Sequence, residues 1–134
     1  MNTRGDVVGA YLAAFATGDA DALAAHVTAD FVNEHLSELG SGCTGRDEYR
    51  RRLPQFLSTF VGARYTVVTL AETAATSAGG NGDVVVRYRF QATYEGTPID
   101  IPGLMWFEVR DGLIARRTDL WDSLTFLRQT GQAD

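Results

Sequence analysis

The segment best suited to chemistry lies near the C-terminal end, where Leu120-Trp121-Asp122 sets a carboxylate among mostly apolar residues. An ionised carboxylate that is buried without a partner costs several kcal/mol, so an acid at such a place indicates either a functional group or a costly exception. A carboxylate whose pKa is raised by apolar surroundings can take a proton from a carbon next to a carbonyl group. We therefore consider Asp122 the first candidate for an acid–base residue.

A β-hairpin over Ile99 to Asp122 is expected to position this acid. Asp111-Gly112 is typical of a two-residue type I′ turn between runs of β-forming residues. The pairs counted outward from this turn are Arg110 with Leu113, Trp106 with Arg117, and Ile101 with Asp122.

Side chains alternate between the two faces of each strand. The more apolar face, which we expect to line the interior, carries Ile101, Met105, Phe107, Val109, Ile114, Thr118, Leu120 and Asp122. The other face carries Asp100, Leu104, Trp106, Glu108, Arg117, Asp119 and Trp121. Pro102-Gly103 can host a bulge that moves Asp100 to the side of Asp122, so Asp100 is a reserve candidate.

Possible partners of the acid come from two other segments. Phe31, Asn33 and His35 alternate on a short extended segment and point one way. With an ordinary pKa near 6.5, His35 suits proton transfer at neutral pH, but a structural hydrogen bond at the surface is the alternative. Asn33 either orients a substrate oxygen or caps a turn. Tyr88 lies in an apolar strand, where its hydroxyl either steadies an oxyanion or makes an incidental hydrogen bond in the core.

The remaining substrate contacts are expected to be apolar. Phe31, Phe56 and Met105 are predicted to line the pocket, whereas a core filled by such side chains would favour a structural role. Asp122 has a structural alternative too, because the helical turn that begins at Ser123 needs an acceptor at its start.

Helical spacing and turn signals divide the rest of the chain into elements. Apolar residues recur with helical spacing in the first segment, and this favours a helix over the signal peptide that Arg4 and Ala14-Phe15-Ala16 loosely suggest. The predicted helices are Asp6–Thr17, Asp19–Val27, Arg46–Phe60 (opened by a capping box of Thr44 and Asp47) and Ser123–Gln129. The predicted strands are Phe31–Leu36, Arg64–Glu72, Asp83–Glu95 and the hairpin, with a flexible loop at Ala74–Gly82.

Length and charge limit the classes of protein. At 134 residues, the chain is expected to be a single domain over residues 1–134. A net charge of -5 and the absence of a basic run argue against nucleic acid or a membrane surface as a partner. All twelve basic residues are arginine, which excludes Schiff-base lysine chemistry and a phosphate-binding P-loop. The single cysteine, Cys43, fits a cytoplasmic location.

The sequence predicts chemistry without a metal or an organic cofactor. The two histidines, His26 and His35, have no third ligand at a spacing typical of zinc or iron sites. Acid–base catalysis by a carboxylate requires neither.

Helices followed by long antiparallel strands predict an α+β fold in which a curved sheet wraps around N-terminal helices and leaves a pocket. This order resembles the nuclear-transport-factor-2-like (NTF2-like) cone. Local motifs resemble its SnoaL-like polyketide cyclase branch: Tyr11-Leu12-Ala13-Ala14-Phe15 with Gly18-Asp19, Ala29-Asp30-Phe31-Val32-Asn33, Gly45-Arg46-Asp47-Glu48, and Arg110-Asp111-Gly112-Leu113-Ile114 leading to Trp121-Asp122.

The resemblance implies a catalytic aspartate near the end of the last strand, at Asp122. Ketosteroid isomerases carry their base on the strand after the second helix, where this chain has Glu34 and His35. Limonene-epoxide hydrolases carry an Arg-x-Asp on an inner strand, where this chain has Arg87-Tyr88-Arg89. The superfamily includes cyclases, isomerases, hydrolases and proteins without catalysis.

Three functions follow as hypotheses. The first is a cofactor-free cyclase or isomerase that acts on a hydrophobic carbonyl-containing or polycyclic small molecule. The second is a non-catalytic protein that binds such a ligand, and the third is an epoxide hydrolase. Because Trp106, Arg117 and Trp121 share the outer face of the predicted hairpin, a homodimer through the convex sheet face is also expected.

Overall fold

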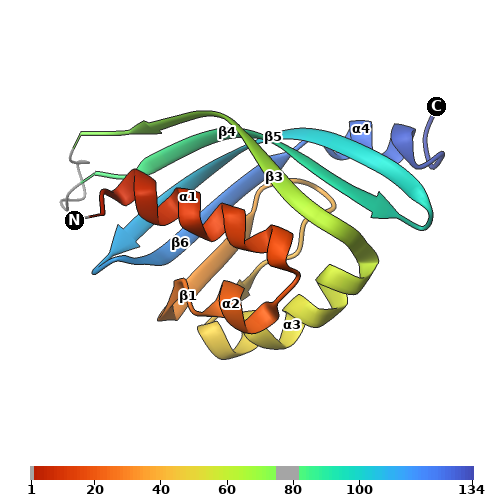
Figure 1. Ribbon diagram of the computed structural model, residues 1–134. Coiled ribbons are helices and arrows are strands. Elements are labelled where there is room, and N and C mark those ends of the chain that lie inside the picture. The colour runs from red at the N-terminus through yellow and green to blue at the C-terminus, as the bar shows by residue number, and fades with distance from the viewer. Residues whose placement is uncertain (1, 75–81) are drawn as a thin grey trace.

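The computed structural model describes residues 2–74 and 82–134 and has the expected α+β architecture. Its first three helices lie on one side of a curved six-stranded sheet and the C-terminal helix lies at one end of it, as Figure 1 shows. The strand order is β2-β1-β6-β5-β4-β3. Strands β1 and β6 run parallel and every other neighbouring pair is antiparallel, which confirms a mostly antiparallel sheet. Of the predicted loop Ala74–Gly82, residues 75–81 lie outside the described part of the chain.

The helices lie close to where the sequence predicts them. They are α1 (Arg4–Ala14), the 3₁₀ turn η1 (Phe15–Thr17), α2 (Ala20–Ala24), α3 (Arg46–Thr59) and α4 (Ser123–Gln129). A capping box of Thr3 and Asp6 opens α1, and the Asp19 side chain caps α2. The capping box predicted before α3 is absent, because Gly45 is the N-cap residue and makes no side-chain cap.

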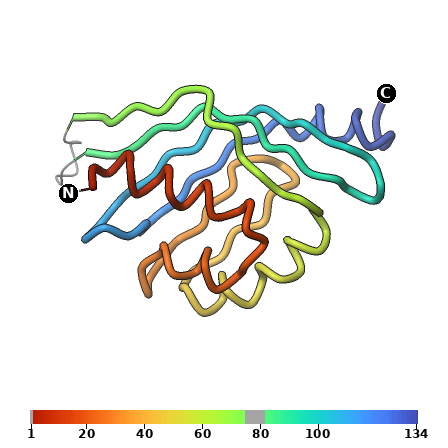
Figure 2. The backbone as a smooth tube through the Cα atoms, in the orientation of Figure 1, coloured from red at the N-terminus to blue at the C-terminus, as the bar shows by residue number. Residues whose placement is uncertain are grey.

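The strands are β1 (Val27–His35), β2 (Cys43–Thr44), β3 (Phe60–Glu72), β4 (Val84–Tyr94), β5 (Thr97–Arg110) and β6 (Leu113–Trp121). Strand β1 begins four residues before the predicted start at Phe31, because its N-terminal end pairs with the start of β6 at Val27 and Ile114. The tube in Figure 2 shows that β1, β6 and β5 lie side by side although they are distant in sequence, and that the termini lie at opposite ends. No described helix is long and apolar enough to cross a membrane.

The hairpin β5–β6 contains a bulge that the sequence pattern does not predict. Asp111 and Gly112 both have positive φ, and Arg110 pairs with Leu113, so the predicted type I′ turn is confirmed. Beyond Val109 and Ile114, however, the register shifts, and Glu108 pairs with Arg116. One residue of β6, Ala115, therefore has no partner on β5. Every later residue of β6 pairs one position away from the pairing that we predicted for a regular hairpin.

The bulge reverses the faces predicted for the second half of β6. Arg117 and Asp119 are buried and face the helices, whereas Leu120 is half exposed on the outer face. Strand β5 keeps the predicted alternation, with Ile101, Met105 and Phe107 buried and Leu104 and Trp106 exposed. Because side chains alternate with a period of two, a single extra residue exchanges inside and outside.

Candidate functional site

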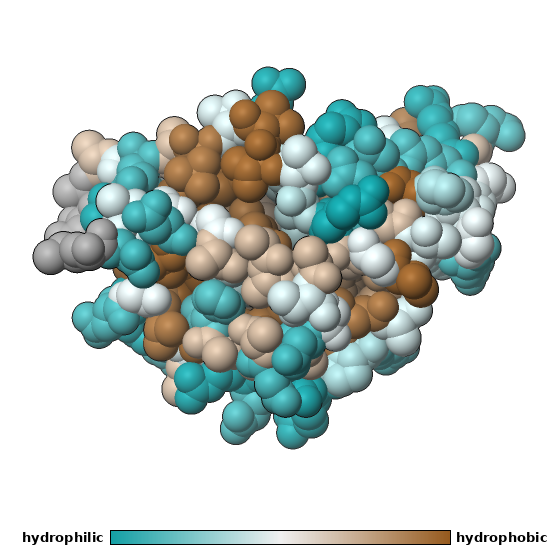
Figure 3. Space-filling model, in the orientation of Figure 1, coloured by the Kyte–Doolittle hydropathy of each residue, from teal (hydrophilic) through white to brown (hydrophobic). Residues whose placement is uncertain are grey.

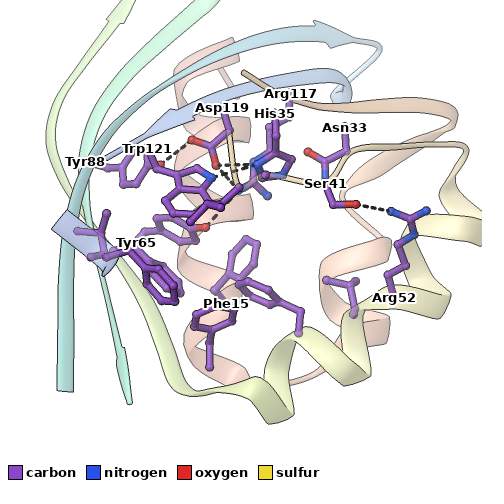
Figure 4. A pocket seen from close by; sticks show the side chains of 18 of the residues that line it. Phe15, Asn33, His35, Ser41, Arg52, Tyr65, Tyr88, Arg117, Asp119 and Trp121 are labelled. Atoms are coloured by element: carbon purple, nitrogen blue, oxygen red, sulfur yellow. Dashed lines mark hydrogen bonds and ion pairs between the residues drawn. The ribbon is translucent and has the colours of Figure 1, made fainter. Parts of the chain in front are cut away.

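A cavity of about 280 Å³ is lined by residues of the sheet and of the helices. Its wall is mostly aromatic and aliphatic, and includes Phe15, Leu53, Phe56, Phe60, Phe90, Ile99, Ile101, Trp121 and Phe126. Polar side chains are concentrated at one end, which is formed by the neighbouring strands β1 and β6 and by β4 on the far side of β5 (Figure 4). A wall of this kind accepts an apolar molecule that carries few polar groups.

The parallel pairing of β1 and β6 assembles the polar end. In the register of these strands Asn33 lies beside Arg117, and His35 lies beside Asp119. All four side chains line the cavity. Two residues per strand, spaced by two, thus form a four-residue polar group on the inner face (Figure 4).

Asp119 is the buried carboxylate of this group, with an exposure of 2%. The hydroxyl of Tyr88 donates to its Oδ1 at 2.5 Å, and Arg117 donates to its Oδ2 at 3.0 Å. Each carboxylate oxygen therefore has a donor, and the guanidinium supplies an opposite charge. Such pairing allows an ionised carboxylate to stay in an apolar interior.

Arg117 connects Asp119 to a set of tyrosines. Besides Asp119, it donates to the hydroxyl of Tyr11 at 3.0 Å and to that of Tyr65 at 3.1 Å. Tyr11 in turn shares a short hydrogen bond with Tyr49 of α3. The guanidinium also lies about 6 Å from the ring centroids of Tyr11, Phe15 and Tyr65, a distance at which cation–π attraction contributes.

His35 is a neutral imidazole in this environment. Its burial, and secondarily the positive charge of Arg117, lower its pKa to about 4, against the opposing influence of Asp119. The 4.0 Å approach of Nδ1 to Asp119 Oδ2 is therefore not an ion pair at neutral pH. Trp121 Nε1–H donates to Nδ1 at 3.4 Å, and because indole is only a donor, the ring proton resides on Nε2.

The tyrosine hydroxyls at this end stay protonated. Burial, together with the charge of Asp119, raises the pKa of Tyr88, and burial raises the pKa of Tyr65. The ring of Tyr88 lies over Gly103 of β5, where an added Cβ would come within 2.3 Å of the hydroxyl oxygen. Gly103 therefore leaves the space that lets Tyr88 reach Asp119.

The structure brings together four of the residues singled out from sequence. Asn33, His35, Tyr88 and Phe56 all line the cavity. Phe31 and Met105 do not, because their side chains pack in the core away from the cavity wall. The prediction that these two line the pocket is wrong.

The two carboxylates predicted from the hairpin lie outside the cavity. Asp122 is exposed, follows the last strand residue, and caps α4 by accepting hydrogen bonds from the backbone and hydroxyl of Thr125. These hydrogen bonds lower its pKa, the opposite of what catalysis from an apolar pocket needs. Asp100 is half exposed on the outer face and pairs with Arg89 at 2.8 Å. The predicted inward orientation is therefore wrong for Asp122, and the possible inward shift of Asp100 does not occur.

Sequence reasoning missed Arg117 and Asp119 because it placed both on the outer face. One available signal was the triplet Arg117-Thr118-Asp119 itself, which sets opposite charges on the same face of a strand. Tyr65 and Tyr11 carried no local signal, because only the fold brings β3 and α1 to Arg117. Trp121, predicted to face outward, also lines the cavity for the same reason as Arg117.

Within residues 2–74 and 82–134, no three His, Cys, Asp or Glu side chains are grouped as a metal site would require. The polar end instead presents donors. These are the hydroxyl of Tyr65, whose oxygen accepts from Arg117 and whose proton has no acceptor among the described residues, and Nε2–H of His35. Such an end suits an oxygen atom that gains negative charge.

Several solved structures share this fold. A protein of ketosteroid isomerase-like fold from Catenulispora acidiphila, in complex with trimethylamine, has a TM-score of 0.81 at 18% identity, covering 94% of this chain and 92% of that one. An epoxide hydrolase of the limonene-epoxide-hydrolase-like type from M. tuberculosis has a TM-score of 0.75 at 20% identity, covering 94% and 87%. A candidate polyketide cyclase from Xanthomonas campestris has a TM-score of 0.66 at 25% identity, covering 94% and 96%.

These likenesses confirm the predicted NTF2-like fold, with its curved, unclosed sheet around the N-terminal helices. No curated protein matches the chain. The sequence profile of the SnoaL-like domain matches residues 8–117, which include most of α1, all of α2 and α3, and most of the sheet. The predicted resemblance is thus confirmed, and the chain belongs to the SnoaL-like domain family.

Proposed function

We propose that the protein is a cofactor-independent acid–base enzyme that acts on a hydrophobic, carbonyl-containing small molecule by isomerisation or cyclisation. The observation that carries this proposal is the buried pair Arg117–Asp119, placed with His35 and Tyr65 at the polar end of an otherwise apolar cavity. Burying a charged pair is a weak source of stability, so its position on the cavity wall favours a role in chemistry.

Asp119 is the group suited to take the proton. It replaces Asp122 in the role expected from sequence, three residues earlier on the chain and on the inner face. The carboxylate removes a proton from the carbon next to the substrate carbonyl, and the electron pair of the broken C–H bond forms an enolate. The proton returns either to another carbon, which isomerises the substrate, or to the oxygen of a second carbonyl that the enolate attacks, which closes a ring.

His35 and Tyr65 are suited to hold the enolate oxygen. The low pKa of His35 keeps its ring neutral at pH 7, so Nε2–H donates a hydrogen bond without transferring its proton readily. The Tyr65 hydroxyl accepts from Arg117, and this polarises it as a donor. In a mostly apolar wall, such donors stabilise developing charge strongly.

The exchange of α-protons is a direct test because it needs no knowledge of the natural substrate. We expect the protein to speed the exchange of the α-protons of 2-tetralone, a bicyclic ketone, in D₂O, and this exchange can be followed by ¹H NMR. Asp119→Asn should lower this rate by about 10²- to 10⁴-fold, the usual contribution of a positioned base. Tyr65→Phe should lower it less, since one oxyanion donor of two remains.

Asp122→Asn is the matched control, because it changes the nearby carboxylate outside the cavity and should leave the exchange rate within a factor of about three. Binding of a panel of cyclic ketones without exchange above the buffer rate would contradict the enzyme proposal. It would favour the second function, a non-catalytic protein that binds apolar ligands in the same cavity.

Epoxide hydrolysis remains a second candidate because β6 carries an Arg-x-Asp, Arg117-Thr118-Asp119, on its inner face. Strand β4 carries Arg87-Tyr88-Arg89 instead, and there Arg87 and Arg89 are exposed on the outer face. An active carboxylate would deprotonate a water that opens the epoxide ring, and the ring oxygen would take a proton. Formation of the diol from styrene oxide in H₂¹⁸O, with no exchange of 2-tetralone, would select this function.

We also propose that the chain forms a homodimer through the outer face of the sheet. Leu104 and Leu120 pair across β5 and β6 and are half exposed, and Trp106 is 44% exposed beside them. In the space-filling view a further hydrophobic patch lies along β3, where Val67 and Val68 are exposed (Figure 3). Sedimentation equilibrium should give a dimer for the native chain and a monomer for Leu104→Glu/Leu120→Glu, because a charge would be buried at the contact.

A further inference from the structure

The two ring nitrogens of His35 have different surroundings. Nδ1 accepts a hydrogen bond from Trp121 Nε1–H at 3.4 Å and lies 4.0 Å from Asp119 Oδ2. The backbone at Gly40 packs against the same part of the ring, since an added Cβ there would come within 3.1 Å of Nδ1. Nε2 has no hydrogen-bond partner among the described residues but keeps accessible surface, and His35 lines the cavity. Nε2 is therefore the nitrogen that a ligand in the cavity can meet.

Trp121 and Asp119 favour different tautomers of this ring (Figure 4). A neutral imidazole carries one proton, and the partner of one nitrogen decides which nitrogen holds it. The indole only donates, so it favours a bare Nδ1 and a proton on Nε2. The ionised carboxylate only accepts, so it favours a proton on Nδ1, which would leave Nε2 as a bare acceptor. Of the two contacts, only that of Trp121 is within hydrogen-bond distance.

We infer that Trp121 is a positioning residue, which holds the proton of His35 on Nε2 so that the cavity presents a donor at this point. The inference deepens the proposed function, on which it rests for the enolate oxygen that this donor meets. Without the indole, the proton moves to Nδ1, on the side of Asp119, and the cavity loses this donor. Trp121 thus acts through His35, and it makes the site select ligands that present a carbonyl or enolate oxygen there.

Contacts on two sides fix Trp121 at the end of β6. Its backbone N–H donates to Ser37 Oγ at 2.7 Å, and Ser37 Oγ donates to its carbonyl oxygen at 2.8 Å. Phe126 of α4 packs edge-on against the indole, with ring centroids 5.9 Å apart. Trp121 and Phe126 both lie beyond residue 117, where the match to the SnoaL-like profile ends. The group that sets the state of His35 therefore comes from the C-terminal segment, outside the matched part of the chain.

A long-range ¹H–¹⁵N correlation spectrum of the ¹⁵N-labelled protein at pH 7 identifies the tautomer without any ligand. The chain has two histidines, so His26 serves as an internal reference, and His35→Leu assigns the His35 signals by their loss. We expect the native ring to be mainly in the Nε2–H form. Trp121→Phe keeps an aromatic ring against Phe126 but removes the donor, so the ratio of Nε2–H to Nδ1–H should fall at least about tenfold, with Nδ1–H as the main form. A native ring in the Nδ1–H form, or an unchanged ratio in Trp121→Phe, would overturn the inference.

Trp106→Phe is the matched control, because Trp106 is the second of the two tryptophans and its indole donates to Asp83 instead. The His35 signals of this variant should match those of the native protein. If Trp106→Phe and Trp121→Phe changed the tautomer equally, the change would come from a general loosening of the fold, and the role of Trp121 would be rejected.

The exchange of 2-tetralone protons connects the tautomer to the proposed chemistry. Trp121→Phe should lower the exchange rate by about three- to tenfold, because the donor form becomes a minor population. In a His35→Leu protein the same substitution should change the rate by less than about twofold, since no imidazole proton remains to be placed. Equal losses in both backgrounds would show that Trp121 acts by packing rather than through His35.

The tautomer and exchange experiments fail independently of each other. A tautomer that Trp121→Phe reverses supports the inference even where no ketone exchanges its α-protons, and in that case only the enzyme proposal is wrong. Exchange by a native protein whose His35 carries its proton on Nδ1 leaves the enzyme proposal standing and rejects the inference.

Discussion

Asp119 and Asp122 lie three residues apart on one segment, yet the fold gives them opposite surroundings. Asp119 is 2% exposed, faces the cavity, and is held by Tyr88 and Arg117. Asp122 is exposed and binds the first turn of α4. The pair teaches that the chemical type of a residue and its place near a strand end do not define its role. The face of the sheet to which its side chain points decides whether the residue lines the cavity or caps a helix.

Removing each carboxylate in turn should change the free energy of unfolding by very different amounts, and the larger loss is expected at Asp119. Asp119→Ala leaves Arg117 buried without its counter-charge, so we expect the free energy of unfolding to fall by about 3–5 kcal/mol. Urea unfolding followed by circular dichroism measures this loss. Arg117→Met/Asp119→Leu removes both charges and should recover most of the stability. A loss below about 1 kcal/mol in Asp119→Ala would mean that Arg117 finds another partner.

The second prediction concerns pH and the imidazole beside Asp119. The pKa of His35 is about 4 in the folded protein and near 6.5 in the unfolded chain, so the unfolded state binds a proton first as the pH falls. Stability is therefore lost between about pH 7 and pH 4, by about 3 kcal/mol from this residue, and the loss stops below the folded pKa.

His35→Gln supplies the control for this pH dependence. Urea unfolding at several pH values should show a shallower loss of stability in the variant, although Asp119, Arg117 and Trp121 still surround position 35. The α-proton exchange rate of the native protein should stay nearly constant between about pH 5.5 and 8, because His35 is already neutral there. Equal pH dependence in the two proteins would mean that His35 titrates normally.

The smallest effect is expected at Asp122. Asp122→Ala removes the N-cap of α4 and should lower the free energy of unfolding by about 1 kcal/mol, with exchange activity retained. Asp122→Ser is the matched variant, since serine is also a good N-cap residue and should keep most of the stability. A large loss of activity in a stable Asp122→Ser protein would reverse the comparison and make Asp122 the functional acid.

Much of the architecture was predictable because it depends on local patterns. Helical spacing in the first segment and the Asp111-Gly112 turn each act over a few residues, and each predicted an element that the structure contains. Of the candidate site, Asn33 and His35 were predictable by alternation along an unbulged part of β1. Tyr88 was predictable as a hydroxyl in an apolar strand that needs a partner, which is Asp119.

The rest depended on long-range geometry that no local pattern encodes. The faces predicted from alternation are correct along β5 but wrong on β6 beyond Ala115. The bulge at Ala115 depends on how β6 pairs with both β5 and β1. The partners of Arg117 come from α1, β3 and β6, segments that only the tertiary fold brings together.

By itself, then, the sequence determined the family, the order of elements and the presence of inward polar residues on β1, because these follow from spacing and composition. The tertiary structure alone decided which aspartate is buried and which groups surround it. The physical reason is that one extra residue in a strand reverses every later side chain, and its position is set by the pairing of strands distant in the chain.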